Sequence, residues 1–401
     1  MIVAVVGSGE LEVPQVGGSI RKFTLRPVRG LCHLGHEVHF FDSTHFDQSK
    51  LGINYPNFYI HKVPHPNFQL LKSSNTTISA FQGHLNMIAF SISLFFKLWK
   101  LIKRIKFDVI NVNTRYDVIA IIFLQKLLNL NIPLVFTCHN SDWSRGRLPL
   151  VLRIFFLPEV FAIKKSTVTV AVSRKQREGI IKNVLVEPEK IKVLYQGVDK
   201  NLFKPGAVPK LNDPYILCVS DISARKNQLV LVEAMPKVLK YFPTCKLIFI
   251  GGIRDKAYLS KINHVARKLG ISKNIEIKGK APFKVLLYWI HKATICTLPT
   301  KREGFPTILL EMLACKKAVI ASRIPEVLEL KDLAGEEIFV TASPNNPDEW
   351  ADKIIELLKD DERRQEYEKK ADKIVVDEVE EARRYVRVYE EAKRATNERL
   401  G

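Results

Sequence analysis

The sequence predicts an α/β protein of two domains, each organised around a parallel β-sheet. Short apolar runs alternate with helix-length stretches along most of the 401 residues, which is typical of a parallel sheet with crossover helices. A stretch containing several Pro and Gly over residues 204–214 interrupts this series, and a second series begins at Tyr215. The length also exceeds that of most single domains. We therefore predict domains over 1–205 and 206–375, followed by a C-terminal helix over 376–401.

The first domain opens with a βαβ unit. The apolar run at residues 2–6 predicts a buried strand, and a helix is predicted from about Ser19 to Leu34 before the next strand. Gly7 and Gly9 are spaced as in the dinucleotide-binding fingerprint, but the third glycine of that fingerprint is missing. The opening therefore indicates a Rossmann-like domain and disfavours a dehydrogenase.

A basic segment follows an uncharged one between residues 73 and 106. Residues 73–96 contain no Lys, Arg, Asp or Glu, but only 85–96 is strongly apolar, and about 20 apolar residues are needed to span a bilayer. We therefore predict no transmembrane helix. Residues 95–106 instead predict a basic amphipathic helix with Trp99 among its apolar residues. Its cations are Lys97, Lys100, Lys103, Arg104 and Lys106. This helix either lies on an anionic membrane surface or packs on the sheet with its lysines in solvent.

His139 occupies a position where α/β proteins bind ligands. It follows an apolar run that ends at residue 137, so it lies at the carboxyl end of a predicted strand. Ligands of open parallel sheets bind outside these strand ends. A lone histidine is more often structural, but this position makes His139 a candidate site residue.

The net charge of +20 is strongly positive and unevenly distributed. Residues 1–205 carry 27 Lys and Arg against 13 Asp and Glu, a surplus of +14, so most of the charge lies in the first domain. Such a surplus favours an anionic partner: a nucleic acid, an acidic lipid surface or a phosphorylated ligand. No nucleic-acid recognition motif or aromatic stacking platform accompanies it, so we expect no nucleic-acid partner.

The six cysteines are far apart in the sequence and form no Cys-x-x-Cys pair or cluster with His. They predict buried, reduced thiols, no metal site and a reducing compartment. The chain also enters an apolar strand at once, without the basic region of a signal peptide. These observations together predict a cytoplasmic protein.

Residues 300–311, Thr-Lys-Arg-Glu-Gly-Phe-Pro-Thr-Ile-Leu-Leu-Glu, form the most informative segment. An apolar run over 293–298 precedes them and predicts a buried strand. Pro306 fits the first position of a helix, where its missing N–H costs nothing. The segment therefore predicts a strand, a turn and a helix, with Glu303 in the turn and Glu311 in the helix.

This arrangement predicts a site for a diphosphate flanked by hydroxyl groups. The N–H groups of Thr307 and Ile308 are expected to point out of the helix N-terminus, where unsatisfied donors and the helix dipole favour a phosphate. The carboxylates of Glu303 and Glu311 can each accept hydrogen bonds from sugar hydroxyls. A nucleotide sugar, which carries a diphosphate between two polyol rings, has the matching chemistry.

The segment resembles the Glu-x7-Glu signature of the retaining glycosyltransferases of family 4, which have the GT-B fold. The spacing alone is weak, but the context of a strand, Leu-Pro-Thr, Glu-Gly-Phe and a helix makes the resemblance specific. The resemblance extends over nearly the whole chain and includes the Val-Gly-Gly-Ser sequence at 16–19. It implies two Rossmann-like βαβ domains facing each other across a donor and acceptor cleft, with the helix over 376–401 returning to the N-terminal domain.

The resemblance also implies roles for individual residues. Glu303, with the backbone of the Gly-Phe-Pro that follows it, would hold the hydroxyls of the transferred sugar, and Glu311 would hold those of the ribose. Lys226 matches the family lysine that binds the diphosphate, whereas the family arginine position falls on Asp221, so Arg225 is expected to replace it. The implied donor-binding residues are Gly17, Gly18, Arg225, Lys226, Gly304, Phe305, Pro306, Thr307, Ile308 and Glu311, and the implied catalytic residues are Glu303 and His139.

The implied activity is transfer of a hexosyl unit from a UDP- or GDP-sugar to an acceptor hydroxyl with retention of configuration, without a bound cofactor or metal. The basic first domain favours a lipid or lipid-linked acceptor, with the protein bound peripherally to the anionic cytoplasmic face of a membrane. A soluble enzyme acting on a sugar phosphate or a polysaccharide is an alternative. Because Asp221 stands at the position of the family arginine, a third hypothesis is that the protein is a catalytically inactive nucleotide-binding homologue.

Overall fold

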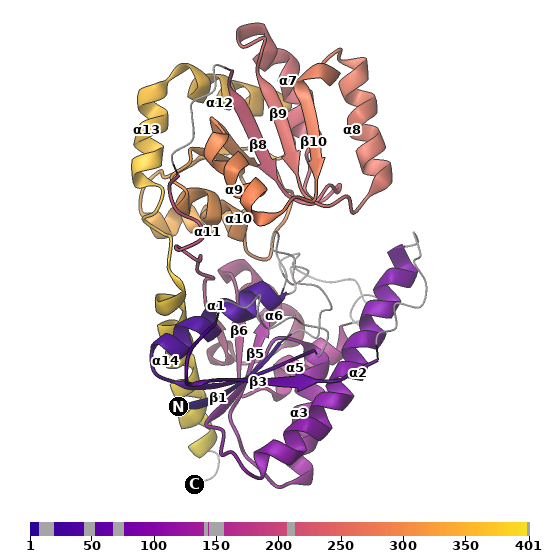
Figure 1. Cartoon of the computed structure of the whole chain (residues 1–401), viewed down its shortest axis with the longest axis vertical. Helices are drawn as coiled ribbons and strands as arrows, with labels where there is room; N and C mark the ends of the chain where they lie inside the picture. Colours follow the sequence, from indigo (N-terminus) through magenta and orange to yellow (C-terminus); the bar gives the residue numbers. More distant parts are fainter. Residues whose placement is uncertain are drawn as a thin grey trace. The chain divides into compact units, whose positions relative to one another are not determined.

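The computed structural model describes residues 1–7, 20–43, 53–66, 76–139, 143, 156–206 and 213–398, with the side chains of 20–23 and 76–81 not described (Figure 1). These residues form two compact units. The first contains the described chain up to Gln196 together with the residues from Glu378 onward, and the second contains the described part of Gly197–Asp377. The chain therefore passes from the first unit into the second and returns.

The first unit is built on a seven-stranded sheet with the strand order β3-β2-β1-β4-β5-β6-β7. Its strands are β1 (Ile2–Val6), β2 (Glu37–Ser43), β3 (Phe58–Val63), β4 (Val109–Val112), β5 (Leu134–Cys138), β6 (Val168–Ala171) and β7 (Ile191–Val193). All neighbouring strands pair in parallel. Every residue of β4, β5 and β6 is buried, because helices cover both faces of the sheet.

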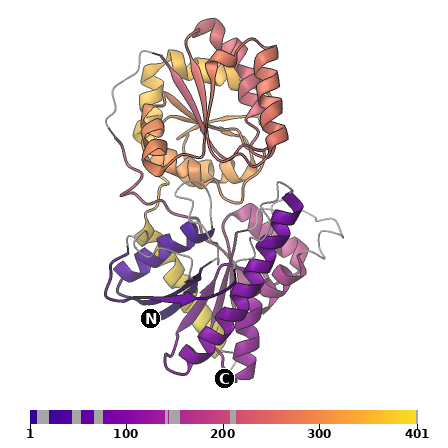
Figure 2. The same ribbon diagram turned by 45° about the vertical axis from the view of Figure 1, so that its right-hand side comes forward.

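Two sets of helices cover this sheet. They are α1 (Ile20–His33), α2 (Thr76–Ile102), α3 (Arg115–Leu127), α5 (Leu157–Lys165), α6 (Arg174–Val184) and α14 (Glu378–Asn397), with a 3₁₀ turn at Pro188–Lys190. Helices α1 and α14 contribute side chains to one hydrophobic core, whereas α2, α3, α5 and α6 contribute to the core on the other face. Figure 2 shows α1 beside α14, and α2 beside α3.

Helix α14 is held on the first unit by close packing and by buried polar contacts. Gly30 permits the close approach of α1, because a Cβ at this position would lie 2.1 Å from the carbonyl oxygen of Glu378. The side chains of Arg26 and Glu381, each 1% exposed, form an ion pair with 3.6 Å between Nε and Oε2. The hydroxyl of Tyr389 accepts a hydrogen bond of 2.7 Å from an asparagine of β4. The last helix of the chain is therefore part of the core of the first unit.

Helix α2 differs from the prediction at its C-terminal end. It ends at Ile102 rather than at Lys106, because the N–H of Arg104 donates to the carbonyl of Leu101 and begins a turn. The predicted basic helix over 95–106 is wrong beyond that point. The apolar part of α2 is also longer than predicted: by length and composition alone, Gln82–Ile102 could cross a membrane, with a mean hydropathy of 1.5.

The second unit is built on a six-stranded parallel sheet with the strand order β10-β9-β8-β11-β12-β13. Its strands are β8 (Tyr215–Val219), β9 (Lys246–Ile250), β10 (Ile275–Gly279), β11 (Ile295–Leu298), β12 (Val319–Ser322) and β13 (Val340–Ala342). Its helices are α7 (Leu229–Tyr241), α8 (Lys256–Lys268), α9 (Phe283–Lys292), α10 (Thr307–Ala314), α11 (Pro325–Ala334), α12 (Pro347–Lys359) and α13 (Asp361–Lys370), with a 3₁₀ turn at Ser272–Asn274. The predicted α/β class with two parallel sheets is confirmed.

In each sheet the strand order reverses at one place, between β1 and β4 in the first unit and between β8 and β11 in the second. The connections leave the sheet in opposite directions at such a point, so a crevice opens outside the carboxyl ends of the two strands. Ligands of open parallel sheets bind in these crevices. The segments that follow β8 and β11 in the second unit, and those that follow β1 and β4 in the first, are therefore the places for a functional site. Most of the segment after β1 lies outside the described residues.

Candidate active site

Two loops at the carboxyl ends of β8 and β11 form the candidate site of the second unit. Residues 220–228 follow β8, and residues 299–306 follow β11 and lead into α10. A backbone hydrogen bond of 2.9 Å, from the N–H of Lys301 to the carbonyl of Arg225, joins the two loops. Because β8 and β11 are neighbours in the sheet, residues that are far apart in the sequence meet here.

Asn227 holds these loops together and is not among the residues predicted from the sequence. Its backbone has a left-handed φ of 58°, which Asn tolerates better than most residues. Its buried side-chain amide donates to the carbonyls of Pro299, at 3.1 Å, and Pro344, at 2.7 Å. It thereby positions Lys226, the preceding residue. Asparagines are common in loops, so its type alone carried no signal.

The carboxylate of Glu303 lies between two cations. Its Oε1 is 2.5 Å from Nζ of Lys226, and its Oε2 is 3.1 Å from Nη1 of Arg225. The side chain of Glu303 is 9% exposed, whereas that of Arg225 is 42% exposed. The structure thus brings together three residues that the sequence placed in a donor site, with the two cations balancing the charge of Glu303.

These cations hold the pKa of Glu303 below its ordinary value. Burial by itself would raise this pKa, because a buried carboxylate loses its hydration. The positive charges of Lys226 and Arg225, together with hydrogen bonds from Lys226 and Thr300, outweigh the effect of burial. Glu303 is therefore ionised, and its charge is compensated within the two loops.

The N-terminus of α10 corrects one part of the predicted anion site. Pro306 precedes the helix, with φ of −83° and ψ of 64°, the conformation of an inverse γ-turn. The N–H of Thr307 accordingly donates to the carbonyl of Phe305, at 3.0 Å. The expectation of an available Thr307 amide, with Pro306 as the first helical residue, is therefore wrong. For the amide of Ile308, anion binding stays a prediction.

Glu311 lies in the body of α10, and its side chain is 3% exposed. Seven of the eight residues of α10 are buried, so little of the surface of this helix is exposed. Phe305 and Pro306 are also buried, whereas Gly304 is half-buried. Most of the segment from Glu303 to Glu311 is therefore buried beside the site.

Asp221 has a structural partner that the sequence did not reveal. Its Oδ1 accepts a hydrogen bond of 2.9 Å from the N–H of Gly252, and its Oδ2 accepts one of 3.0 Å from Nε of Arg254. The loop after β9 is thereby joined to the loop after β8. Gly251 contributes to this close approach, because a Cβ there would lie 2.0 Å from the carbonyl oxygen of Ser220. Asp221 is thus a paired carboxylate that shapes the loops.

In the first unit, His139 follows β5, which pairs with β4 and lies one strand away from the place where the strand order reverses. Its Nε2 lies 3.0 Å from Oδ1 of Asn113, whose Nδ2 donates to the carbonyl of Val6. Its Nδ1 lies 3.5 Å from Nε2 of Gln196. Burial, followed by the charge of Arg26, lowers the pKa of His139 to about 4. The imidazole is therefore neutral near pH 7, with Nε2 as its donor to Asn113.

The other predicted residues of the first unit are only partly placed. Gly17 and Gly18 lie outside the described residues. Lys100, Lys103, Arg104 and Lys106 are exposed, and Lys97 is half-buried. Trp99 packs against the hydrophobic core, and Nζ of Lys103 lies 5.7 Å from the centroid of its ring. Trp99 is thus only partly buried, and its place at a membrane surface stays a prediction.

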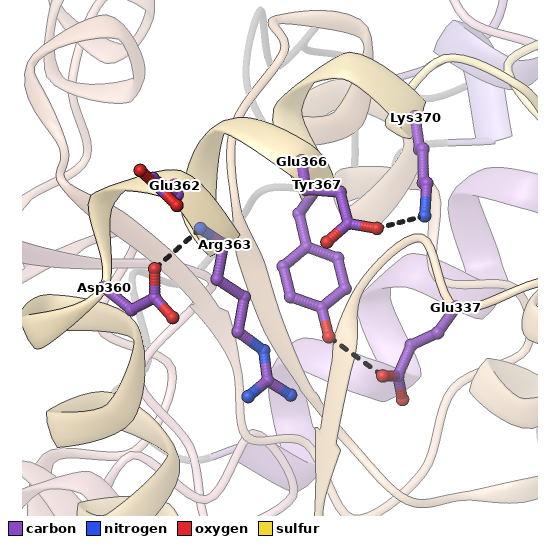
Figure 3. Close-up of a pocket in the computed structure, with 7 residues that line it drawn as sticks. All are labelled: Glu337, Asp360, Glu362, Arg363, Glu366, Tyr367 and Lys370. Atoms are coloured by element: carbon purple, nitrogen blue, oxygen red, sulfur yellow. Dashed lines mark hydrogen bonds and ion pairs between the residues drawn. The ribbon is translucent and has the colours of Figure 1, made fainter.

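A hollow of about 480 Å³ on the second unit lies away from these residues (Figure 3). It is lined by Glu337, Asp360, Glu362, Arg363, Glu366, Tyr367 and Lys370. The hydroxyl of Tyr367 donates to Glu337 at 2.9 Å, and Lys370 pairs with Glu366 at 2.5 Å. These internal pairs engage most of the charged groups, and we assign the hollow no ligand. Among the described residues, no group of three His, Cys, Asp or Glu is arranged to hold a metal.

Comparisons with known proteins match both units. The profile of Glycosyltransferase Family 4 matches residues 20–202, and that of Glycosyl transferases group 1 matches residues 199–374. An uncharacterised glycosyltransferase of Methanocaldococcus jannaschii is 27% identical over 91% of each chain. The N-acetyl-α-D-glucosaminyl L-malate synthase of Bacillus anthracis is 25% identical over 87% of this chain and 86% of its own. A component of the phosphatidylinositol N-acetylglucosaminyltransferase of Arabidopsis thaliana is 22% identical over 82% of this chain and 69% of its own.

Solved structures share the fold at lower identity. The sucrose-phosphate synthase of Thermosynechococcus elongatus superposes with a TM-score of 0.74 at 16% identity, over 97% of this chain and 98% of its own. The Anabaena protein HepE, in complex with UDP and glucose, superposes with a TM-score of 0.71 at 15% identity, over 97% of this chain and 99% of its own. Two Rossmann-like α/β units that superpose on these structures define a protein of the GT-B fold. With both profiles matched in order along residues 20–374, the chain belongs to glycosyltransferase family 4.

Proposed function

We propose that this chain transfers a hexosyl unit from a nucleotide-diphosphate sugar to an acceptor hydroxyl, with retention of configuration at the anomeric carbon. The observation that carries this proposal is the cluster of Glu303, Lys226 and Arg225 at the carboxyl ends of β8 and β11. Cations at such a place suit a diphosphate, and a carboxylate suits sugar hydroxyls. The UDP and glucose of the Anabaena complex support this class of donor.

Donor binding in this proposal is an exchange of partners. A diphosphate competes with Glu303 for Lys226 and Arg225, and the displaced carboxylate becomes the acceptor for sugar hydroxyls. Arg225, which is 42% exposed, can leave Glu303 with little change in burial, whereas Lys226, which is 15% exposed, stays in place. One set of charge-assisted hydrogen bonds replaces another, so the exchange has a small net cost. Glu311 and the amide of Ile308 complete the proposed donor site.

In the proposed chemical step, the acceptor oxygen bonds to the anomeric carbon on the face from which the diphosphate oxygen departs. The proton of the acceptor passes to that departing oxygen, so the step needs no pair of carboxylates of the kind that glycosidases use. Lys226 and Arg225 stabilise the negative charge that develops on the diphosphate. His139, proposed as the second catalytic residue, contributes a hydrogen bond without positive charge, because its imidazole is neutral.

For the acceptor, we favour a lipid or lipid-linked glycan at the cytoplasmic face of a membrane. The surplus of +14 in residues 1–205 supports an anionic surface as partner. The Arabidopsis relative is named for transfer to a phosphatidylinositol lipid, which supports the same choice. The Bacillus relative is named for transfer to L-malate, so a small soluble acceptor is the second candidate.

A panel of UDP- and GDP-sugars tests the donor class by thermal shift. A donor at 100 times its dissociation constant should raise the free energy of unfolding by about 2.7 kcal/mol. Slow release of the nucleoside diphosphate without acceptor would exclude the inactive homologue, and the anomeric NMR signal of a product would show retention. If no nucleotide sugar stabilises the wild-type protein, the proposed function is wrong.

A further inference from the structure

The first unit presents a large apolar surface on α2 and α3. Six side chains form it, which we call the α2–α3 ridge: Ile88, Ile92 and Phe96 on α2, and Ile119, Phe123 and Leu127 on α3. Successive members on each helix are four residues apart, so each set lines one helical face. Their exposed fractions range from 37% for Ile119 to 62% for Phe123.

The two halves of the ridge are adjacent. Helices α2 and α3 pack side by side (Figure 1), and the ring of Phe95 lies 5.8 Å from the ring of Phe123. A soluble protein rarely exposes a contiguous apolar surface of several large side chains, so such a surface indicates a binding site. Single exposed apolar residues elsewhere need no such explanation.

The surroundings of the ridge are basic. Between residues 82 and 107 the chain contains no Asp or Glu. Near the C-terminal end of α2, Lys100, Lys103 and Arg104 are exposed, and Lys126 is exposed beside the last ridge residue of α3. The one acidic residue of α3, Asp117, is fully buried and accepts hydrogen bonds from Ser91 and Thr114. The ridge is therefore an apolar surface bordered by cations.

We propose that the α2–α3 ridge inserts into the headgroup region of an anionic lipid bilayer and docks the first unit on it. Acyl chains take up the six apolar side chains, and anionic headgroups meet the bordering cations, as in interfacial amphipathic helices. This inference deepens the proposed function, on which it rests for the choice of a lipid-linked acceptor. It differs from docking by charge alone, because the apolar side chains supply most of the binding.

The ridge lies on the bilayer, and α2 does not span it. The opposite face of α2 carries Phe90, Leu94 and Leu98, each at most 1% exposed, in the hydrophobic core of the first unit. A spanning helix would have to withdraw these three side chains from the core, and removal of each large buried side chain is strongly destabilising. Only the outer face of α2 is thus available to lipid.

Flotation with phosphatidylcholine vesicles containing phosphatidylglycerol tests the proposal on the full-length protein. The ridge variant combines Ile92→Ser, Phe96→Ser and Phe123→Ser. The control variant combines Tyr241→Ser, Leu269→Ser and Leu333→Ser, which replace exposed apolar side chains of the second unit. We expect the ridge variant to partition about a hundredfold more weakly than the wild type, because three inserted apolar side chains are lost, and the control variant to match the wild type.

A label on the ridge distinguishes insertion from adsorption by charge. The six native cysteines are buried, so a cysteine introduced by Phe96→Cys can be labelled selectively with an environment-sensitive fluorophore. We expect its emission to shift to the blue on vesicle addition, and lipid-borne quenchers to quench it, even in high salt. The same label introduced by Leu269→Cys should not respond.

Three outcomes would overturn the proposal: vesicle binding that survives in the ridge variant, a Phe96→Cys label that lipid quenchers do not reach, or no vesicle binding by the wild type. If the wild type is then a dimer by sedimentation and the ridge variant a monomer, the occupant is a second copy of the chain. Donor-induced thermal stabilisation separates the two proposals. It should be equal in the ridge variant and the wild type, whereas its absence from both would contradict the proposed function and leave docking standing.

Discussion

At the scale of single residues, charge balance dominates the candidate site. Glu303 is ionised in a nearly enclosed position only because Lys226 and Arg225 face it. The cost of burying one carboxylate is offset by two cations that are well placed for a diphosphate. The three side chains are thus paired with one another, and in the proposed function a donor would exchange these contacts for its own.

Glu303→Gln tests this competition. Removal of the carboxylate leaves both cations available, so we expect UDP or GDP alone to bind several-fold more tightly than to the wild type. We also expect kcat to fall about 10²-fold, because the contact to the sugar hydroxyls is weakened in the transition state. Calorimetric titration and steady-state kinetics measure the two effects. Glu276→Gln, which breaks an exposed pair with Lys278, is the control and should change neither. Weaker binding of the nucleoside diphosphate to Glu303→Gln would contradict the exchange.

His139 predicts a pH dependence of stability. Its folded-state pKa of about 4 lies below the ordinary value of 6.5, so between these values the unfolded chain binds a proton that the folded protein does not. Stability is therefore complete above pH 6.5 and falls as the pH drops towards 4. A single such proton contributes a slope of at most about 1.4 kcal/mol per pH unit. His139→Gln should reduce the slope of urea-unfolding free energy against pH in this window. An unchanged slope would show that His139 is protonated in the folded protein.

At the scale of elements, the molecule depends on close approaches between segments that are far apart in the sequence. Helix α14 crosses α1 at Gly30, and the loop after β9 meets the loop after β8 at Gly251. In both places the backbone of the neighbouring segment occupies the space that a Cβ on the glycine would need. Such contacts depend on tertiary packing, and we expect their disruption to lower the free energy of unfolding.

Gly30→Ala should destabilise the first unit. The new Cβ would lie 2.1 Å from the carbonyl oxygen of Glu378, and α14 would have to move away. Overpacking of this kind costs about 1–3 kcal/mol. Gly83→Ala in α2 is the matched control: nothing lies within 4 Å of its Cβ position, so the better helix propensity should stabilise by about 0.5–1 kcal/mol. Chemical denaturation compares the two variants. A stability of Gly30→Ala equal to that of the wild type would mean that α14 does not lie as close to α1 as described.

The contacts of Asp221 with Gly252 and with Arg254 should contribute unequally to the free energy of unfolding. Arg254 is 75% exposed, so Arg254→Ala should change the free energy of unfolding by no more than about 0.5 kcal/mol. Asp221→Ala removes in addition the acceptor for the N–H of Gly252, and we expect it to cost about 1 kcal/mol and to weaken donor binding. Asp221→Asn keeps a side-chain oxygen for this N–H and should recover part of the loss. Equal effects of Arg254→Ala and Asp221→Ala would assign the role of Asp221 to the ion pair.

At the scale of the whole molecule, the path of the chain links the two units. Both described ends of the chain belong to the first unit, and the second unit is inserted before α14. Tyr385, Val388 and Tyr389 of α14 are buried in the same core as the strands β1 and β2. The first unit is therefore complete only after the second has been synthesised.

A chain that ends at Asp377 should lose the fold of the first unit and keep that of the second. Each large buried side chain of α14 contributes about 1.5–3 kcal/mol, and three of them approach the total stability of a typical domain. Scanning calorimetry should show a single transition that belongs to the second unit, with a correspondingly smaller enthalpy. A chain that ends at Glu398 is the control. Two unaltered transitions in the shorter chain would show that α14 is dispensable.

Features that depend on local order could be predicted from the sequence. Hydrophobic periodicity and turn residues can be read from short stretches of consecutive residues. They predicted the buried strands, the βα alternation and the turn and helix of the segment from Glu303 to Glu311. The family could be predicted for the same reason, because the motif from Glu303 to Glu311 is a short continuous segment, and the two family profiles confirmed it. The sequence by itself thus determined the fold class and the segments that carry the candidate site.

Tertiary structure alone decided which groups those segments meet. The inverse γ-turn occupies the N–H of Thr307, Asp221 reaches Arg254, and Asn227 joins three segments of the second unit. The sequence likewise did not decide that Phe96 is exposed whereas Trp99, on the same helix, packs partly against the core, since both are apolar and only packing assigns their faces. Contacts between distant positions depend on strand order and on helix docking, and their free energies come from burial and pairing rather than from any local preference of the chain.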